Sequence, residues 1–200
     1  MKIIKKIIII TSVVLIGILY ATGNWSDAIY DTNINGANYE SLKNLDDNIV
    51  VEQEFTCKHK GLDGFRIRFS TLNRKNIGKY SWQLIEKSTQ KIIEEGNVDF
   101  TKINSKGEYR IDFDKLEESA GNVYTFKIQA QNVTEDEAIT LYKTSSEELA
   151  GPLYVDGNKT EGSTILKMYC HRFDVETFVV FCGFALYLAV FIWFMTKLFK

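Results

Sequence analysis

The chain has 200 residues, 45% of them hydrophobic, and a formal net charge of −2 at pH 7. The charges are uneven, because residues 21–175 hold 25 Asp or Glu and 19 Lys or Arg, a net charge of −6. Nucleic-acid binding needs a basic patch that contacts phosphates, so this acidic middle excludes nucleic acid as the expected partner.

Residues 1–23 form an apolar segment with a basic start. Three lysines precede an uncharged run of 14 residues from Ile7 to Tyr20. Such a segment is either a secretory signal peptide, cleaved at the small residues that follow, or a short uncleaved span anchored by Trp25. We favour the uncleaved transmembrane segment or signal anchor, and cleavage stays open as the alternative.

Residues 24–47 are polar and rich in turn-forming residues, which predicts an irregular lead-in. Within it, "DTNING" (31–36) matches the opening of a calcium loop. The twelfth position, where a calcium loop has a bidentate Glu, is Leu42. We therefore interpret this stretch as a turn and expect no metal here.

Residues 48–175 show the alternation of apolar and polar residues that is typical of half-buried strands. The strands that we expect are 49–59, 65–71, 80–84, 91–100, 109–113, 124–130, 138–143 and 163–173. Regularly spaced short strands predict an antiparallel sandwich of the jelly-roll type. The expected fold class is therefore all-β, a jelly-roll-like β-sandwich flanked by an N-terminal and a C-terminal transmembrane helix.

The C-terminal segment, residues 176–196, predicts a second membrane span. The 19 residues from Thr177 to Met195 carry no charge, and as a helix they would be about 28 Å long, close to the hydrocarbon thickness of a bilayer. Residues 197–200 then form a cytoplasmic tail with two lysines. The positive-inside rule places both termini in the cytoplasm, unless the N-terminal segment is cleaved. We therefore expect a cell-membrane protein whose bulk is extracytoplasmic.

Two of the three cysteines are candidates for a disulfide. Cys57 shares a strand face with Val51 and Phe55, and Cys170 shares one with Leu166 and Met168, so both are expected in the core. If the first and last strands are neighbours, Cys57 and Cys170 lie opposite each other and can bond in an oxidising compartment. Two buried, reduced thiols are the alternative.

The histidines beside these cysteines, His59 and His171, raise the possibility of a zinc site. Adjacent residues of a strand point to opposite faces, so Cys170 and His171 cannot both reach one tetrahedral ion. We therefore expect no metal.

The polar sides of the strands would form a polar sheet face that is either a binding surface or simply solvated. Its members are Arg66, Arg68, Ser81, Gln83, Glu108, Arg110 and Asp112. A sugar-binding face usually presents aromatic side chains, yet Trp82 falls on the apolar side of its strand. The sequence has no nucleophile elbow or phosphate loop, so we expect no catalytic residue, no cofactor and no enzymatic activity.

The order of strands resembles a known family of modules. The features are an F-x-C and L-x-G-F opening, the strand "GKYSWQL" after an asparagine-containing turn, and "SAGNVYTFKIQAQN", all between Ile49 and Tyr142. In these features the chain resembles the extracytoplasmic β-sandwich modules of bacterial membrane proteins of cell-surface polysaccharide synthesis. The resemblance implies a sandwich fold and a cell-surface context, but no transferase activity, because the multi-spanning catalytic part of those proteins has no counterpart here.

These patterns together predict a non-catalytic accessory or glycan-binding protein of bacterial cell-surface polysaccharide synthesis. Its expected partners are the lipid bilayer and either a multi-spanning membrane glycosyltransferase or a cell-surface glycan. The alternatives are a structural subunit of a transporter or secretion complex, and an enzyme whose site is assembled by the fold.

Overall fold

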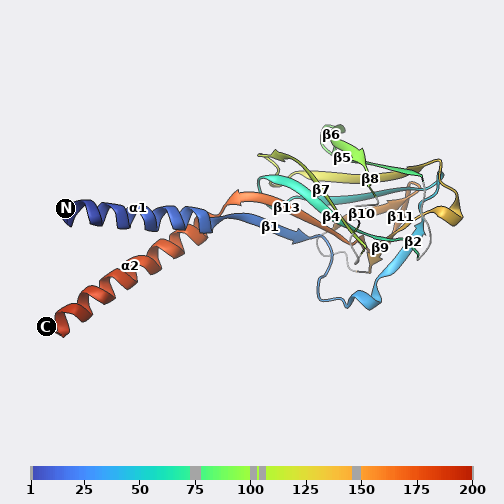
Figure 1. Cartoon of the computed structure of the whole chain (residues 1–200). Helices are drawn as coiled ribbons and strands as arrows, with labels where there is room; N and C mark the ends of the chain where they lie inside the picture. The colour runs from blue at the N-terminus through green and yellow to red at the C-terminus, as the bar shows by residue number, and fades with distance from the viewer. Residues whose placement is uncertain (1, 73–77, 100–102, 104–106, 146–149, 200) are drawn as a thin grey trace. The chain divides into compact units, whose positions relative to one another are not determined.

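The computed structural model describes residues 2–72, 78–99, 103, 107–145 and 150–199 (Figure 1). It divides into two compact units: residues 26–170 form one, and the two terminal segments, 1–25 and 171–200, form the other. The first unit consists of two layers of antiparallel β-sheet (Figure 1).

The first layer is a six-stranded sheet with the order β11-β10-β3-β8-β5-β6. Its strands are β3 (Val50–Thr56), β5 (Lys79–Glu86), β6 (Lys91–Asn97), β8 (Val123–Gln131), β10 (Ala150–Val155) and β11 (Asn158–Thr160). The central pair, β3 and β8, is antiparallel over seven residues of each strand, from Val50 opposite Gln129 to Thr56 opposite Val123.

The second layer is a seven-stranded sheet with the order β1-β13-β4-β9-β12, in which β7 also pairs with β4 and β2 with β9. Its strands are β1 (Thr22–Ala28), β2 (Glu40–Asn44), β4 (Leu62–Ser70), β7 (Glu108–Leu116), β9 (Thr140–Thr144), β12 (Ser163–Thr164) and β13 (Leu166–Phe173). Short 3-10 helices, η1 (Gly36–Asn38) and η3 (Glu135–Glu137), lie in the connections.

All eight expected strands are present within the described residues. The range expected as one strand at 163–173 is divided into β12 and β13, and the expected end of the strand at residue 100 lies outside the described part. The two-sheet antiparallel fold with an apolar helix at each end is confirmed, whereas the jelly-roll type stays a prediction.

The expected irregular lead-in, residues 24–47, differs from the structure because it contains most of β1 and all of β2. Both strands are polar, and they pair with β13 and β9 respectively. Their pairing depends on backbone hydrogen bonds, which no alternation of side chains reveals. The structure also adds β10 and β11. Pro152 lies in β10 where the register shifts between Ala150 and Leu153, a position that tolerates a residue without an N–H.

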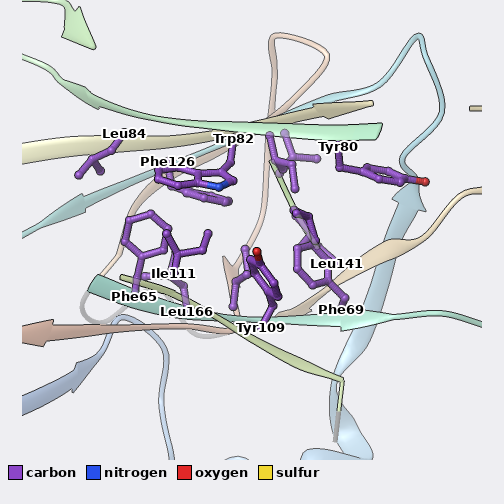
Figure 2. Close-up of a cluster of buried hydrophobic side chains, with 14 of the residues drawn as sticks. Phe65, Phe69, Tyr80, Trp82, Leu84, Tyr109, Ile111, Phe126, Leu141 and Leu166 are labelled. Atoms are coloured by element: carbon purple, nitrogen blue, oxygen red, sulfur yellow. The ribbon is translucent and has the colours of Figure 1, made fainter. Parts of the chain in front are cut away.

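Side chains from the two sheets point toward one another and fill the core (Figure 2). Phe65 of β4 meets Trp82 and Phe126 of the opposite sheet edge to face, with ring centroids 5.5 and 5.1 Å apart. Phe65 and Phe126 are fully buried, and burial of each such ring stabilises the fold by about 1.5–3 kcal/mol.

One polar side chain also joins the two sheets. Gln53 of β3 is fully buried, and its Nε2 donates to the carbonyl oxygens of Glu54 and Gly151 at 2.8 and 2.9 Å. Its Oε1 accepts from Thr164 N at 2.8 Å and from Thr164 Oγ1 at 3.3 Å. Because Thr164 belongs to β12, Gln53 is a satisfied cross-link between the layers.

The second unit contains two helices, α1 (Lys2–Ala21) and α2 (Val175–Leu198), which are long and apolar enough to cross a membrane. Asp174 caps α2 by accepting a hydrogen bond from Thr177 N at 3.3 Å. The helices touch at Gly17, where an added Cβ would lie 2.8 Å from the ring of Phe181. Gly17 therefore permits the close approach of α1 to α2.

Candidate functional site

The structure brings Cys57 and Cys170 together in the core. Their Sγ atoms lie 4.0 Å apart, and both residues are buried. Cys57 follows β3 of the six-stranded sheet, whereas Cys170 belongs to β13 of the seven-stranded sheet. The sequence made a Cys57–Cys170 contact conditional on neighbouring strands. The strands are not neighbours, since β3 pairs with β10 and β8, and the two thiols instead face each other between the sheets. Their bonding stays a prediction.

The loop after β3 surrounds this thiol pair with hydrogen-bonding groups. The carbonyl oxygen of His59 accepts from Cys57 Sγ at 3.1 Å and from Ser119 Oγ at 2.9 Å, and Ser119 Oγ accepts from Leu62 N at 3.0 Å. The hydrogen bond from the Cys170 thiol lowers the pKa of Cys57 to about 7. The same hydrogen bond, together with burial, raises the pKa of Cys170.

Near these sulfurs, His59 contributes its backbone carbonyl oxygen, whereas its imidazole ring contacts Asp27. His59 Nε2 lies 3.1 Å from Asp27 Oδ2, and the exposed His171 alternates with the buried Cys170 along β13. Within the described ranges, no group of three or more His, Cys, Asp or Glu side chains is placed to hold a metal ion.

The stretch "DTNING" forms local turns. Asp31 Oδ1 accepts hydrogen bonds from Asn33 N at 2.8 Å and Asn33 Nδ2 at 3.0 Å. Asn35 Oδ1 accepts from Ala37 N at 3.0 Å and caps η1. The Asp and Asn side chains thus have the turn-forming role that their residue types favour.

The polar face expected from the sequence is divided between the two sheets. Ser81 and Gln83 belong to β5 of the six-stranded sheet. The remaining five expected residues lie on β4 and β7 of the seven-stranded sheet, and the side of this sheet that faces away from the core is called the outer face below.

Tyrosine and arginine side chains stack on the outer face. Arg68 lies between two rings, with its Cζ 5.4 Å from the centroid of Tyr39 and 5.3 Å from that of Tyr142. Its Nε is buried and has no hydrogen-bond partner among the described residues. The ring of Tyr30 meets Tyr39 edge to face at 6.1 Å, and burial raises the pKa of Tyr30, so its hydroxyl stays neutral.

A second stack lies on the same face. Tyr169 of β13 has Arg66 Cζ at 5.4 Å and Arg110 Cζ at 4.3 Å from its ring centroid. Arg66 is on β4 and Arg110 is on β7, so the ring of Tyr169 and the guanidinium of Arg110 meet across β4. Gly64, the residue opposite Tyr169 on β4, has no side chain to obstruct it.

These tyrosines were missed by the sequence analysis, which found no aromatic residue on the polar face. Strand alternation places Tyr169 on the same side of its strand as the exposed His171, and Tyr142 on the side opposite the buried Leu141. The sequence pattern therefore contained the information needed to place both tyrosines on the outer face. Tyr39 precedes a strand that was not expected, and its contact with Arg68 depends on the pairing of β2 with β9.

Three open hollows are lined by described residues. One on the outer face is water-sized and includes Tyr30, Arg66, Arg68, Glu108 and Lys167. Another lies over β5 and β6, around Trp82 and Gly96, and the third follows the chain from Ser26 to Asn33. Of these three, the outer-face hollow combines several cations with one aromatic side chain, Tyr30.

No protein-family model matches the chain, and no curated protein matches it. Among solved structures, a mitogen from Yersinia pseudotuberculosis aligns with 8% sequence identity over 76% of this chain and 87% of that chain, with a TM-score of 0.26. A similarity this low carries no argument about function. The resemblance to modules of polysaccharide synthesis stays a prediction.

Proposed function

We propose that the protein is a membrane-anchored β-sandwich that acts outside the cell membrane as a non-catalytic accessory or glycan-binding protein in bacterial cell-surface polysaccharide synthesis. The observation that carries the proposal is the placement of Arg68 between Tyr39 and Tyr142 on the outer face. Aromatic rings with adjacent hydrogen-bond donors suit sugars, because a ring packs against C–H groups while the donors reach hydroxyls.

The two apolar terminal helices support the membrane part of the proposal. In this arrangement α1 and α2 lie in the bilayer, both chain ends are cytoplasmic, and the sandwich faces the cell exterior, where a growing polysaccharide and a multi-spanning glycosyltransferase are within reach. Consecutive strands from β3 to β5 and from β6 to β10 alternate between the two sheets, which supports the finer jelly-roll description.

The glycan-binding part is tested by measuring how strongly the full chain in detergent binds polysaccharide that has been purified from the envelope of the bacterium that produces the protein. Tyr39→Ala and Tyr142→Ala should each weaken this retention of polysaccharide by at least fivefold. Tyr154→Ala is the matched control, because Tyr154 is a half-buried tyrosine of β10 in the other sheet. Equal retention of all three variants and the unmodified chain would refute a role for the Tyr–Arg stack.

The accessory part is tested by purifying the tagged protein from its native membranes in mild detergent and identifying co-purifying proteins by mass spectrometry. Stoichiometric recovery of a multi-spanning glycosyltransferase supports the proposal. Stoichiometric recovery of transporter or secretion components instead would replace it with the structural-subunit alternative.

A further inference from the structure

Three cations stand in one row across the outer face of the seven-stranded sheet. Lys167 of β13 is directly opposite Arg66 of β4, and Arg66 is directly opposite Arg110 of β7. Directly opposite side chains of an antiparallel pair have Cβ atoms about 4.5–5.5 Å apart, and like charges at this separation destabilise a sheet. A row of three such residues therefore needs an explanation other than the stability of the fold.

Neighbouring carboxylates neutralise this row incompletely. Asp112 Oδ1 lies 2.6 Å from Arg110 Nε, and Glu108 Oε2 lies 3.5 Å from Arg66 Nη1. Lys167 Nζ forms no ion pair with any residue in the described part of the chain. With Arg68 in the next register position, opposite Glu108, four cations face two carboxylates. The outer face is thus locally positive in a domain that is acidic as a whole.

The arginines of the row are also held in place. Both guanidinium groups contact the Tyr169 ring, and a stacked, planar guanidinium loses less rotamer entropy when it binds an anion. Gly64 is essential to this arrangement, because a Cβ there would come within 2.6 Å of Ile111 O and 3.2 Å of Asp112 Oδ1. The row is therefore a preorganised set of donors beside the outer-face hollow.

We propose that Lys167, Arg66 and Arg110 bind the carboxylate or phosphate groups of an acidic glycan. The inference rests on the proposed glycan-binding function and narrows it to polysaccharides with anionic repeats. A glycan is favoured over other anions because the Tyr39–Arg68–Tyr142 stack lies on the same face and offers a sugar-packing surface next to the cations. Successive anionic residues of a polymer could occupy the row while the neighbouring sugars contact the tyrosines.

The test measures binding of the full chain in detergent to four probes: polygalacturonate, its methyl ester, poly(glycerol phosphate) and dextran. Polygalacturonate and its methyl ester share the sugar and differ in charge, and poly(glycerol phosphate) distinguishes phosphate from carboxylate. We expect tight binding to at least one acidic polymer, at least tenfold weaker binding to the methyl ester and dextran, and weakening by salt.

Variants locate the site. Lys167→Glu and Arg110→Gln should each reduce binding to the acidic polymer at least fivefold. Lys91→Gln is the matched control, because it removes a cation from the exposed start of β6 in the other sheet and should leave binding unchanged. Lys167→Gln should have a melting temperature equal to or above that of the unmodified chain, because it removes a like-charge neighbour of Arg66. A lower melting temperature would show that the row is structural and would overturn the inference.

The outcomes separate the inference from the function on which it rests. Binding to the methyl ester or dextran that is as tight as binding to the acidic polymers would overturn the charge inference and leave glycan binding intact. Binding to neither acidic nor neutral polymers would overturn both. Binding to vesicles with anionic phospholipid that depends on Lys167, without polymer binding, would assign the row to a lipid surface and also overturn the inference.

Discussion

Oxidation of Cys57 and Cys170 to a disulfide should stabilise the sandwich strongly. The two sulfurs are 4.0 Å apart, and bond formation brings them about 2 Å closer. The cysteines are 113 positions apart in sequence, and in the chain-entropy model a cross-link that closes a loop of about 100 residues contributes about 4.7 kcal/mol. For a domain of this size, that free energy raises the melting temperature by about 10–20 °C.

The assay uses the full chain in detergent with Cys182→Ala, which removes the third thiol. Oxidised glutathione accepts the two electrons of the thiol pair, and alkylation followed by mass spectrometry counts the thiols that remain. Thermal unfolding is then followed by tryptophan fluorescence with and without reductant. The Cys57→Ala/Cys170→Ala variant is the control and should melt at one temperature in both conditions.

Two outcomes would refute the reasoning. Persistence of two alkylatable thiols after oxidation would show that the sulfurs cannot approach each other. A disulfide that forms without raising the melting temperature would show that strain or residual structure in the unfolded chain cancels the loop-closure contribution.

Three further predictions concern the core and the reduced thiol pair. Phe65→Ala should lower the free energy of unfolding by about 3–5 kcal/mol in urea titrations, because it leaves a cavity beneath Trp82 and Phe126; Ile92→Ala, at a side chain 43% exposed, should have a much smaller effect. Gln53→Leu leaves Thr164 N without its acceptor and should cost about 1–3 kcal/mol by the same titration, and a stability equal to that of the unmodified chain would contradict the cross-link. In the reduced protein, the pKa of Cys57 is about 7 when folded and lies below its unfolded value of about 8.5, so the stabilisation from its thiolate is lost as the pH falls through 7. Urea midpoints should therefore rise between pH 7 and pH 8, and an equal rise in the variant without Cys57 and Cys170 would disprove this origin.

Alternation of side chains predicted most of the sandwich, because burial imposes a period of two on each long strand. In β4, Phe65, Ile67 and Phe69 are buried while Arg66 and Arg68 are only partly buried. The same rule correctly placed Cys57 and Cys170 in the core. It failed for β2, in which Leu42 is the one apolar side chain and packs half-buried against the core, because a single apolar residue defines no period.

The alternation of side chains does not predict the spatial order of the strands. Alternation assigns a residue to a face but does not say which strand lies beside it. Whether β3 and β13 are neighbours in one sheet therefore stayed open, and the structure places them in different sheets. For the same reason, the row of Lys167, Arg66 and Arg110 could not be predicted from the sequence. Those residues are separated by long stretches of chain and become neighbours through the registers of two strand pairs.

The cross-link from Gln53 to Thr164 also constrains how the protein is made. Its two residues are 111 positions apart, so the cross-link cannot form until β12 has been synthesised. Such non-local pairing slows folding and leaves unpaired edges open to aggregation. Because β12 and β13 follow every strand of the six-stranded sheet in the chain, truncation before β12 should yield a product that lacks this cross-link and depends on chaperones.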